Sequence, residues 1–104
     1  MKAEKLPLSV DRLVRALCAD YERRARELLR GKLPPEQLAF FSELNDGIDR
    51  ALTGCDVGVR QILREDIALG RGFTYSPQCC MCAGTYKKYK RQAKWAIARH
   101  FRLL

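Results

Sequence analysis

Apolar residues recur along this chain at the spacing of an α-helix, in four stretches that glycine and proline separate. In the first stretch the hydrophobic positions fall three or four residues apart, between Ser9 as the expected N-cap and Gly31 as the expected stop. We therefore predict one long amphipathic helix over residues 9–30. Its opposite face mixes Arg23, Arg24 and other charged residues, which is typical of a solvated surface.

The second and third stretches predict two more helices. Pro35 can occupy the first position of a helix over residues 35–53, which Gly54 ends. A third helix is expected over residues 56–69, closed by Gly70. The apolar positions of these helices are Leu38, Phe41, Leu44, Ile48 and Leu52, followed by Val59, Ile62, Leu63 and Ile67.

The last stretch predicts a final helix that runs nearly to the C-terminus. Residues 73–83 have no clear periodicity, although Ser76 before Pro77 can start a short helical turn. Thr85 is the expected N-cap of the final helix. The predicted buried stripe of that helix consists of Tyr86, Tyr89, Ala93, Ile97 and Phe101. The predicted fold class is all-α, a four- to five-helix bundle with a C-terminal helix-turn-helix-like unit.

A length of 104 residues predicts a single helical domain over residues 1–104. Within it we expect an N-terminal helical pair over 9–53 and a helix-turn-helix-like DNA-binding part over 56–104. No apolar run approaches the roughly 18 residues of a membrane span, and the first ten residues lack the apolar core of a signal peptide. These features predict a cytoplasmic protein that does not enter a membrane.

The excess positive charge of the chain is confined to its last third. Residues 1–70 carry 12 basic and 12 acidic side chains, whereas residues 71–104 carry eight Lys or Arg and no Asp or Glu, for a net charge of +8. A neutral body with a cationic end is typical of a chain that binds a polyanion. The expected partner is double-stranded DNA, because Lys and Arg that displace counterions from phosphates supply affinity independent of sequence.

The cations of the last helix lie beside its apolar stripe. No carboxylate interleaves with them, and the positive N-terminal end of the helix disfavours Lys87 and Lys88 unless an anion is present. In helix-turn-helix proteins the N-terminal residues of the second helix contact base edges, and neighbouring residues bind phosphates. We therefore expect DNA contacts from Thr85, Tyr86, Lys87, Lys88, Lys90, Arg91 and Lys94. Thr85 and Tyr86 are expected to position the DNA backbone.

Two other interpretations of this helix stay open. Its lysines can simply solvate one face, as most charge runs do. Alternatively, the chain is a non-enzymatic interaction module whose basic amphipathic C-terminal helix fills a partner's groove or lies on an anionic membrane. The anchors would then be Trp95, Ile97, Phe101, Leu103 and Leu104, although a domain of this size needs its final helix to close the core.

The five cysteines form an odd set and predict reduced thiols. Cys79 and Cys82 have C-x-x-C spacing and, with Cys80 and His100, raise the possibility of zinc, but a structural site needs four ligands and no second C-x-x-C is present. We expect no metal and no cofactor. The sequence also lacks a Gly-rich phosphate loop after a strand, and it pairs no nucleophile with an evident base. It predicts a protein that is not an enzyme.

The segment from Val59 to Leu104 resembles a known family. The run VRQILREDIALGRGFTYSP, followed by MCAGTYKKYKRQAKWAIARHFRL, is similar to the C-terminal part of phage and prophage transcriptional regulators of the ArpU and RinA kind, which resemble sigma-factor region 4. The resemblance covers somewhat under half of the chain. It implies a sequence-specific transcriptional regulator, with Thr85, Tyr86, Lys87, Lys88 and Arg91 on its recognition helix. A homodimer on a palindromic site and a monomer docked on RNA polymerase both stay open.

Overall fold

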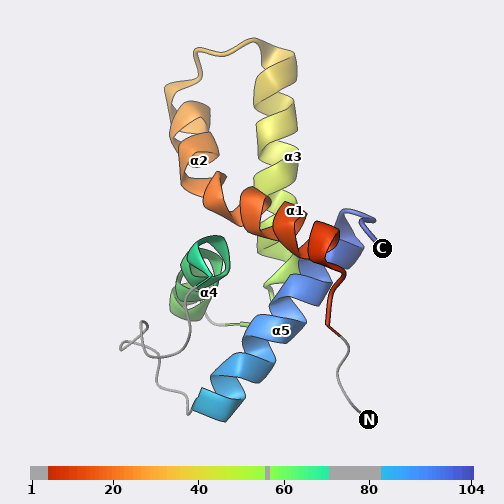
Figure 1. Cartoon of the computed structure of the whole chain (residues 1–104). Helices are drawn as coiled ribbons and strands as arrows, with labels where there is room; N and C mark the ends of the chain where they lie inside the picture. Colours follow the sequence, from red (N-terminus) through yellow and green to blue (C-terminus); the bar gives the residue numbers. More distant parts are fainter. Residues whose placement is uncertain (1–4, 56, 71–82) are drawn as a thin grey trace.

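Five α-helices make up the part of the chain that the computed structural model describes, residues 5–55, 57–70 and 83–104. No strand occurs among these residues, so the predicted all-α class is confirmed. The short helical turn expected at Ser76 lies outside them. The helices are α1 (Leu8–Ala19), α2 (Tyr21–Arg30), α3 (Pro35–Ala51), α4 (Val57–Leu69) and α5 (Ala83–His100), as Figure 1 shows.

The first predicted helix is in fact two helices, so the single helix over 9–30 is wrong. Asp20, with φ −95° and ψ 0°, separates α1 from α2, and the chain changes direction there (Figure 1). The cause is a tertiary contact of Arg24, which is only 2% exposed instead of solvated. Its guanidinium donates to the Leu17 carbonyl at 2.5 Å and to Asn45 Oδ1 of α3 at 2.7 Å. The first bond joins α2 to α1, and the second holds α2 against α3.

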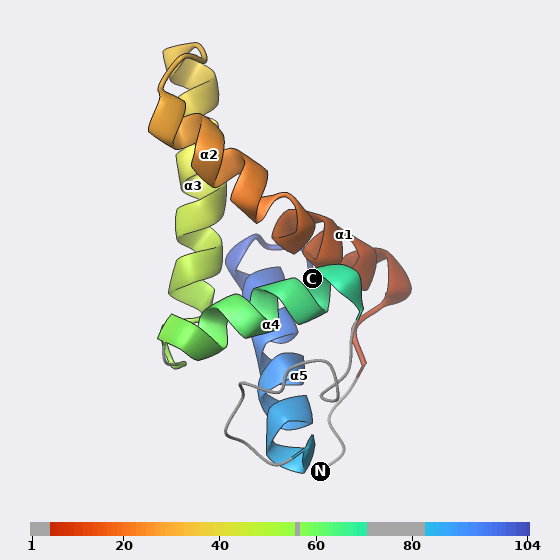
Figure 2. The same cartoon turned by 90° about the vertical axis from the view of Figure 1, so that its left-hand side faces the viewer.

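The helices α2 and α3 run antiparallel and form an arm that projects away from α4 and α5 (Figures 1 and 2). Gly31 ends α2 in the left-handed conformation, with φ +64°, and its N–H donates to the Glu27 carbonyl. A residue with a Cβ is strained in this conformation, so the stop predicted at Gly31 is confirmed. Pro35 is the first residue of α3, as the sequence indicates.

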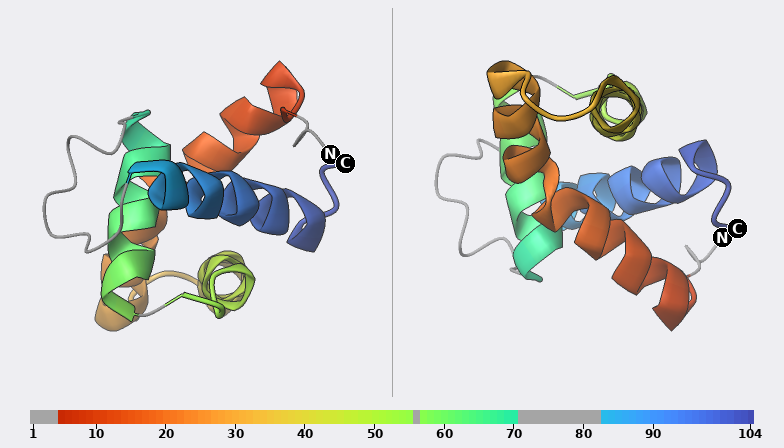
Figure 3. Two further views of the ribbon diagram at one scale, coloured as in Figure 1. Left: turned by 90° about the horizontal axis from the view of Figure 1, so that it is seen from below. Right: turned by 90° about the horizontal axis from the view of Figure 1, so that it is seen from above.

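The hydrophobic core lies where α1, α4 and α5 meet the C-terminal end of α3. Figure 3 shows α5 crossing α4, and α1 packs against both of these helices. The sequence predicts two parts of the domain, over residues 9–53 and 56–104. Residues of both parts contribute to this one core. Its members are Val10, Val14 and Cys18 of α1, Ile48 of α3 with Leu52 directly after that helix, Leu63 and Ile67 of α4, and Tyr86, Ala93, Ile97 and Ala98 of α5.

Several predicted helix boundaries shift by a few residues. Thr85 is not the N-cap of the final helix, because α5 begins two residues earlier at Ala83. Similarly, Ser9 lies inside α1, which begins after Pro7. The α4 helix ends at Leu69, so the connection to α5 is much longer than the three- or four-residue turn of a helix-turn-helix.

Among the described residues, no helix is long and apolar enough to cross a bilayer.

Candidate nucleic-acid interface

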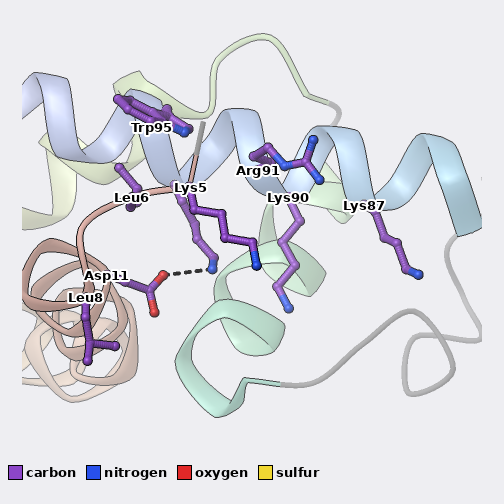
Figure 4. A pocket seen from close by; sticks show the side chains of 9 residues that line it. Lys5, Leu6, Leu8, Asp11, Lys87, Lys90, Arg91 and Trp95 are labelled. Atoms are coloured by element: carbon purple, nitrogen blue, oxygen red, sulfur yellow. Dashed lines mark hydrogen bonds and ion pairs between the residues drawn. The ribbon is translucent and has the colours of Figure 1, made fainter. Parts of the chain in front are cut away.

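A cationic groove lies between one flank of α5 and the segment that leads into α1. It has a volume of about 450 Å³ and is lined by five cationic side chains and one carboxylate. Figure 4 shows Lys5, Lys87 and Lys90 on the same side of α5. The lining residues are Lys5, Leu6, Leu8 and Asp11 on one wall and Lys87, Lys90, Arg91, Lys94 and Trp95 on the other. We refer to this feature as the cationic groove.

Helical spacing places four cations of α5 on one flank. Positions 87, 91 and 94 fall three or four residues apart, and Lys90 lies between this row and the buried stripe. Tyr86 and Ile97, both fully buried, fix the orientation of the helix. The segment before α1 adds Lys5 to the opposite wall. The groove is therefore built from residues at the two ends of the chain.

One cation of the groove is neutralised by the protein itself. Lys94 Nζ lies 2.8 Å from Asp11 Oδ1 in a partly buried ion pair, which the dashed line in Figure 4 marks. The expectation that the cationic flank has no counter-charge is thus wrong for Lys94. By contrast, the part of the chain that the structure describes offers no ion pair to Lys87 or Arg91, and both side chains are exposed. These two cations remain available to an external anion.

Lys90 lies deeper in the groove than its neighbours. Desolvation by burial, followed by repulsion from Lys94, lowers the pKa of Lys90 below its ordinary value of 10.5. The groove thus holds this lysine in an environment that disfavours its charged form. A bound phosphate would reverse that effect, because a nearby negative charge favours the ammonium form.

The remaining predicted contacts lie apart from the groove. Lys88 and Thr85 are exposed, but neither lines it. Tyr86 is fully buried, and its hydroxyl donates a hydrogen bond to Asp66 of α4. The side chain of Tyr86 therefore cannot reach DNA, and its assignment as a DNA contact is corrected. The sequence placed Tyr86 in the buried stripe as well, and that assignment is confirmed.

The sequence pattern did not indicate Lys5 and Asp11 as members of the groove. Asp11 and Lys94 are 83 positions apart, and no local pattern connects them. The sequence indicates Trp95 only as a membrane or partner anchor. Of the other anchors it indicates, Ile97 is fully buried and Phe101 and Leu103 pack against the core, whereas Leu104 is exposed.

Cys18 is a free thiol, as expected. Burial raises the pKa of the Cys18 thiol to about 11, so it stays protonated at neutral pH. Cys79, Cys80 and Cys82 lie outside the described residues. Among those that are described, no three His, Cys, Asp or Glu side chains come together as a metal site.

Comparison with known protein families, curated proteins and solved structures finds no match for this chain. The resemblance to phage and prophage regulators therefore stays a prediction from the sequence.

Proposed function

We propose that this protein binds double-stranded DNA through the cationic groove and the exposed first turns of α5. The observation that supports this most strongly is the pair Lys87 and Arg91, two exposed cations one helical turn apart without a carboxylate partner among the described residues. Five cations and one carboxylate line the groove, so its lining is predominantly positive. A phosphate backbone can neutralise this positive charge and release its own counterions.

The arrangement of cations around α5 favours a duplex. Lys87 and Lys88 are both exposed and differ by about 100° around the helix axis, because an α-helix has 3.6 residues per turn. A helix that enters the major groove lies between two phosphate backbones. Lys87 and Arg91 would contact one backbone, and Lys88 the other. Tyr86 would hold the helix in position from inside the protein.

We extend this proposal to the role that the resemblance implies. We infer a cytoplasmic, non-enzymatic transcriptional regulator of phage or prophage origin that reads a specific DNA sequence. It would act either as a homodimer or as a monomer docked on RNA polymerase. Selection of bound duplexes from a random pool tests this part. An enriched sequence with two inverted halves supports the dimer, an enriched single site supports the monomer, and no enrichment contradicts sequence-specific recognition.

Trp95 provides a direct test of the binding site, because it is the only tryptophan and it lines the cationic groove. Titration with a duplex oligonucleotide should change the intrinsic fluorescence with the same midpoint as the anisotropy of a labelled duplex. The double variant Lys87→Ala/Arg91→Ala should shift both midpoints to higher protein concentration.

The matched control is Arg26→Ala/Lys32→Ala, which removes the same charge at exposed positions outside the groove. It should weaken binding less than the groove variant does. Binding without any change at Trp95 would place the interface elsewhere on the molecule. Absence of duplex binding at low salt would contradict the proposed function.

A further inference from the structure

One end of the cationic groove is apolar and the other end is positively charged. Trp95 and Leu6 lie together at one end, and Lys87 lies at the other, with Lys5 and Lys90 between them (Figure 4). Eight helical positions separate Lys87 from Trp95, which corresponds to about 12 Å along α5. Binding of phosphates alone does not account for the apolar end of the groove.

We propose that the cationic groove binds a nucleotide, with phosphates at the Lys87 and Arg91 end and the base against Trp95. This inference rests on the proposed function, because it assigns phosphates to the same cations, and it adds a base-binding end. The groove volume of about 450 Å³ falls within the range of about 300–1,000 Å³ that is usual for small-molecule sites. The distance along α5 matches a base, a sugar and more than one phosphate.

The side chains at the apolar end suit an aromatic base. Trp95 is half-buried and lines the groove, the Arg99 guanidinium lies 5.5 Å from the centre of its ring, and Leu6 and Leu8 line the opposite wall. Contacts of this kind accept every base, because each base has an aromatic face. The Asp11 carboxylate can accept a hydrogen bond from a sugar hydroxyl or from a base amino group.

Two sources could supply such a nucleotide, namely a free nucleoside triphosphate or an unpaired nucleotide of a nucleic-acid strand. Both present an aromatic base joined to phosphates, and the shared chemistry is what the groove recognises. Calorimetric titration with ATP, adenosine and inorganic triphosphate tests that chemistry. ATP should bind about tenfold more tightly than inorganic triphosphate, since stacking one base on an aromatic side chain has roughly this effect.

Variants separate the two ends of the groove. Trp95→Leu should remove the advantage of ATP over triphosphate and leave triphosphate binding unchanged, whereas Trp95→Phe should keep most of the advantage. Lys87→Ala/Arg91→Ala should weaken ATP and triphosphate alike, and the control Arg26→Ala/Lys32→Ala should weaken both less. Circular dichroism confirms that each variant is folded before it is compared.

Competition distinguishes the sources. If a single-stranded oligonucleotide displaces ATP at a nucleotide concentration far below that of ATP, the base-binding end belongs to a strand. If it does not displace ATP, this end belongs to the free nucleotide. Equal affinity for ATP and triphosphate, or an ATP advantage that survives Trp95→Leu, overturns the inference. If duplex DNA then still binds and depends on Lys87 and Arg91, the proposed function stands alone. If ATP binds and duplex DNA does not, the proposed function fails and the nucleotide site remains.

Discussion

Tyr86 illustrates how neighbouring side chains on one helix serve different purposes. It is fully buried and bonded to Asp66, whereas Lys87, the next residue, is exposed in the cationic groove. Both are polar residues near the start of α5, and composition alone does not separate them. Their positions differ by about 100° around the helix axis, and this difference decides which one meets the core.

Replacement of Tyr86 by Phe tests whether Tyr86 stabilises the fold without contacting DNA. The variant lacks the hydroxyl that donates to the buried Asp66, so the free energy of unfolding should fall by about 1–3 kcal/mol. Urea denaturation measures this decrease. DNA affinity, measured where the variant is fully folded, should not change. Weakened DNA binding at unchanged stability would restore Tyr86 as a DNA-binding residue.

Lys90 predicts a pH dependence of DNA binding. Burial, followed by repulsion from Lys94 and Arg15, lowers the pKa of Lys90, and attraction by Asp66 and Asp11 does not fully offset these effects. The charged form that favours phosphate is therefore present at low and neutral pH and disappears, as pH rises, earlier than in an exposed lysine. Between about pH 7 and pH 10, duplex affinity should fall more steeply for the wild type than for Lys90→Arg, which stays charged.

The matched control for this pH dependence is Lys88→Arg, at an exposed position outside the groove. It should follow the wild-type curve. Parallel curves for wild type and Lys90→Arg would exclude Lys90 as the titrating group.

Among the helices, local signals predicted several ends well and missed the break at Asp20. Gly31 and Pro35 act through their own backbone, so the end of α2 and the start of α3 could be predicted from the sequence. The break between α1 and α2 arises from Arg24 and Asn45, which lie 21 positions apart. No helical period encodes a hydrogen bond to another helix, so the pattern alone favoured one continuous helix.

Arg24→Ala should destabilise the protein strongly. It leaves the Leu17 carbonyl and Asn45 Oδ1 without their donor, and each unsatisfied acceptor should lower the free energy of unfolding by about 1–3 kcal/mol. The control is Arg23→Ala, because the neighbouring Arg23 pairs with Asp20 at the surface and should contribute little. Similar urea midpoints for the two variants would show that Arg24 does not hold the bend.

For the molecule as a whole, the charge distribution located the candidate site only in part. The acid-free last third of the sequence indicated α5, and Lys87, Lys90, Arg91 and Lys94 do line one groove. The opposite wall could not be predicted, because it requires the fold to bring the segment at Lys5 against α5. For the same reason, the pairing of Lys94 with Asp11 became visible only in three dimensions.

Asp11 pairs with Lys94 and so reduces the number of cations that the protein would offer to DNA under our proposal. Its carboxylate occupies Lys94 in the absence of DNA, so phosphate must compete with it. Asp11→Asn should therefore raise duplex affinity and steepen its salt dependence by up to about 0.9 log units per tenfold change in salt, the value for one additional bound phosphate. Electrophoretic mobility shifts over a salt series measure both quantities. Unchanged affinity and slope would mean that Lys94 takes no part in binding.

DNA binding by this protein depends, in our proposal, on exposed and uncompensated cations of α5 that bind the phosphate backbone. The decisive measurement is the slope of log affinity against log salt concentration for a duplex, compared between the wild type and Lys87→Ala/Arg91→Ala. We expect the slope of the double variant to be flatter by about 0.9 for each phosphate that its alanines no longer neutralise. An identical slope in the double variant, while the duplex still binds, would refute the proposal.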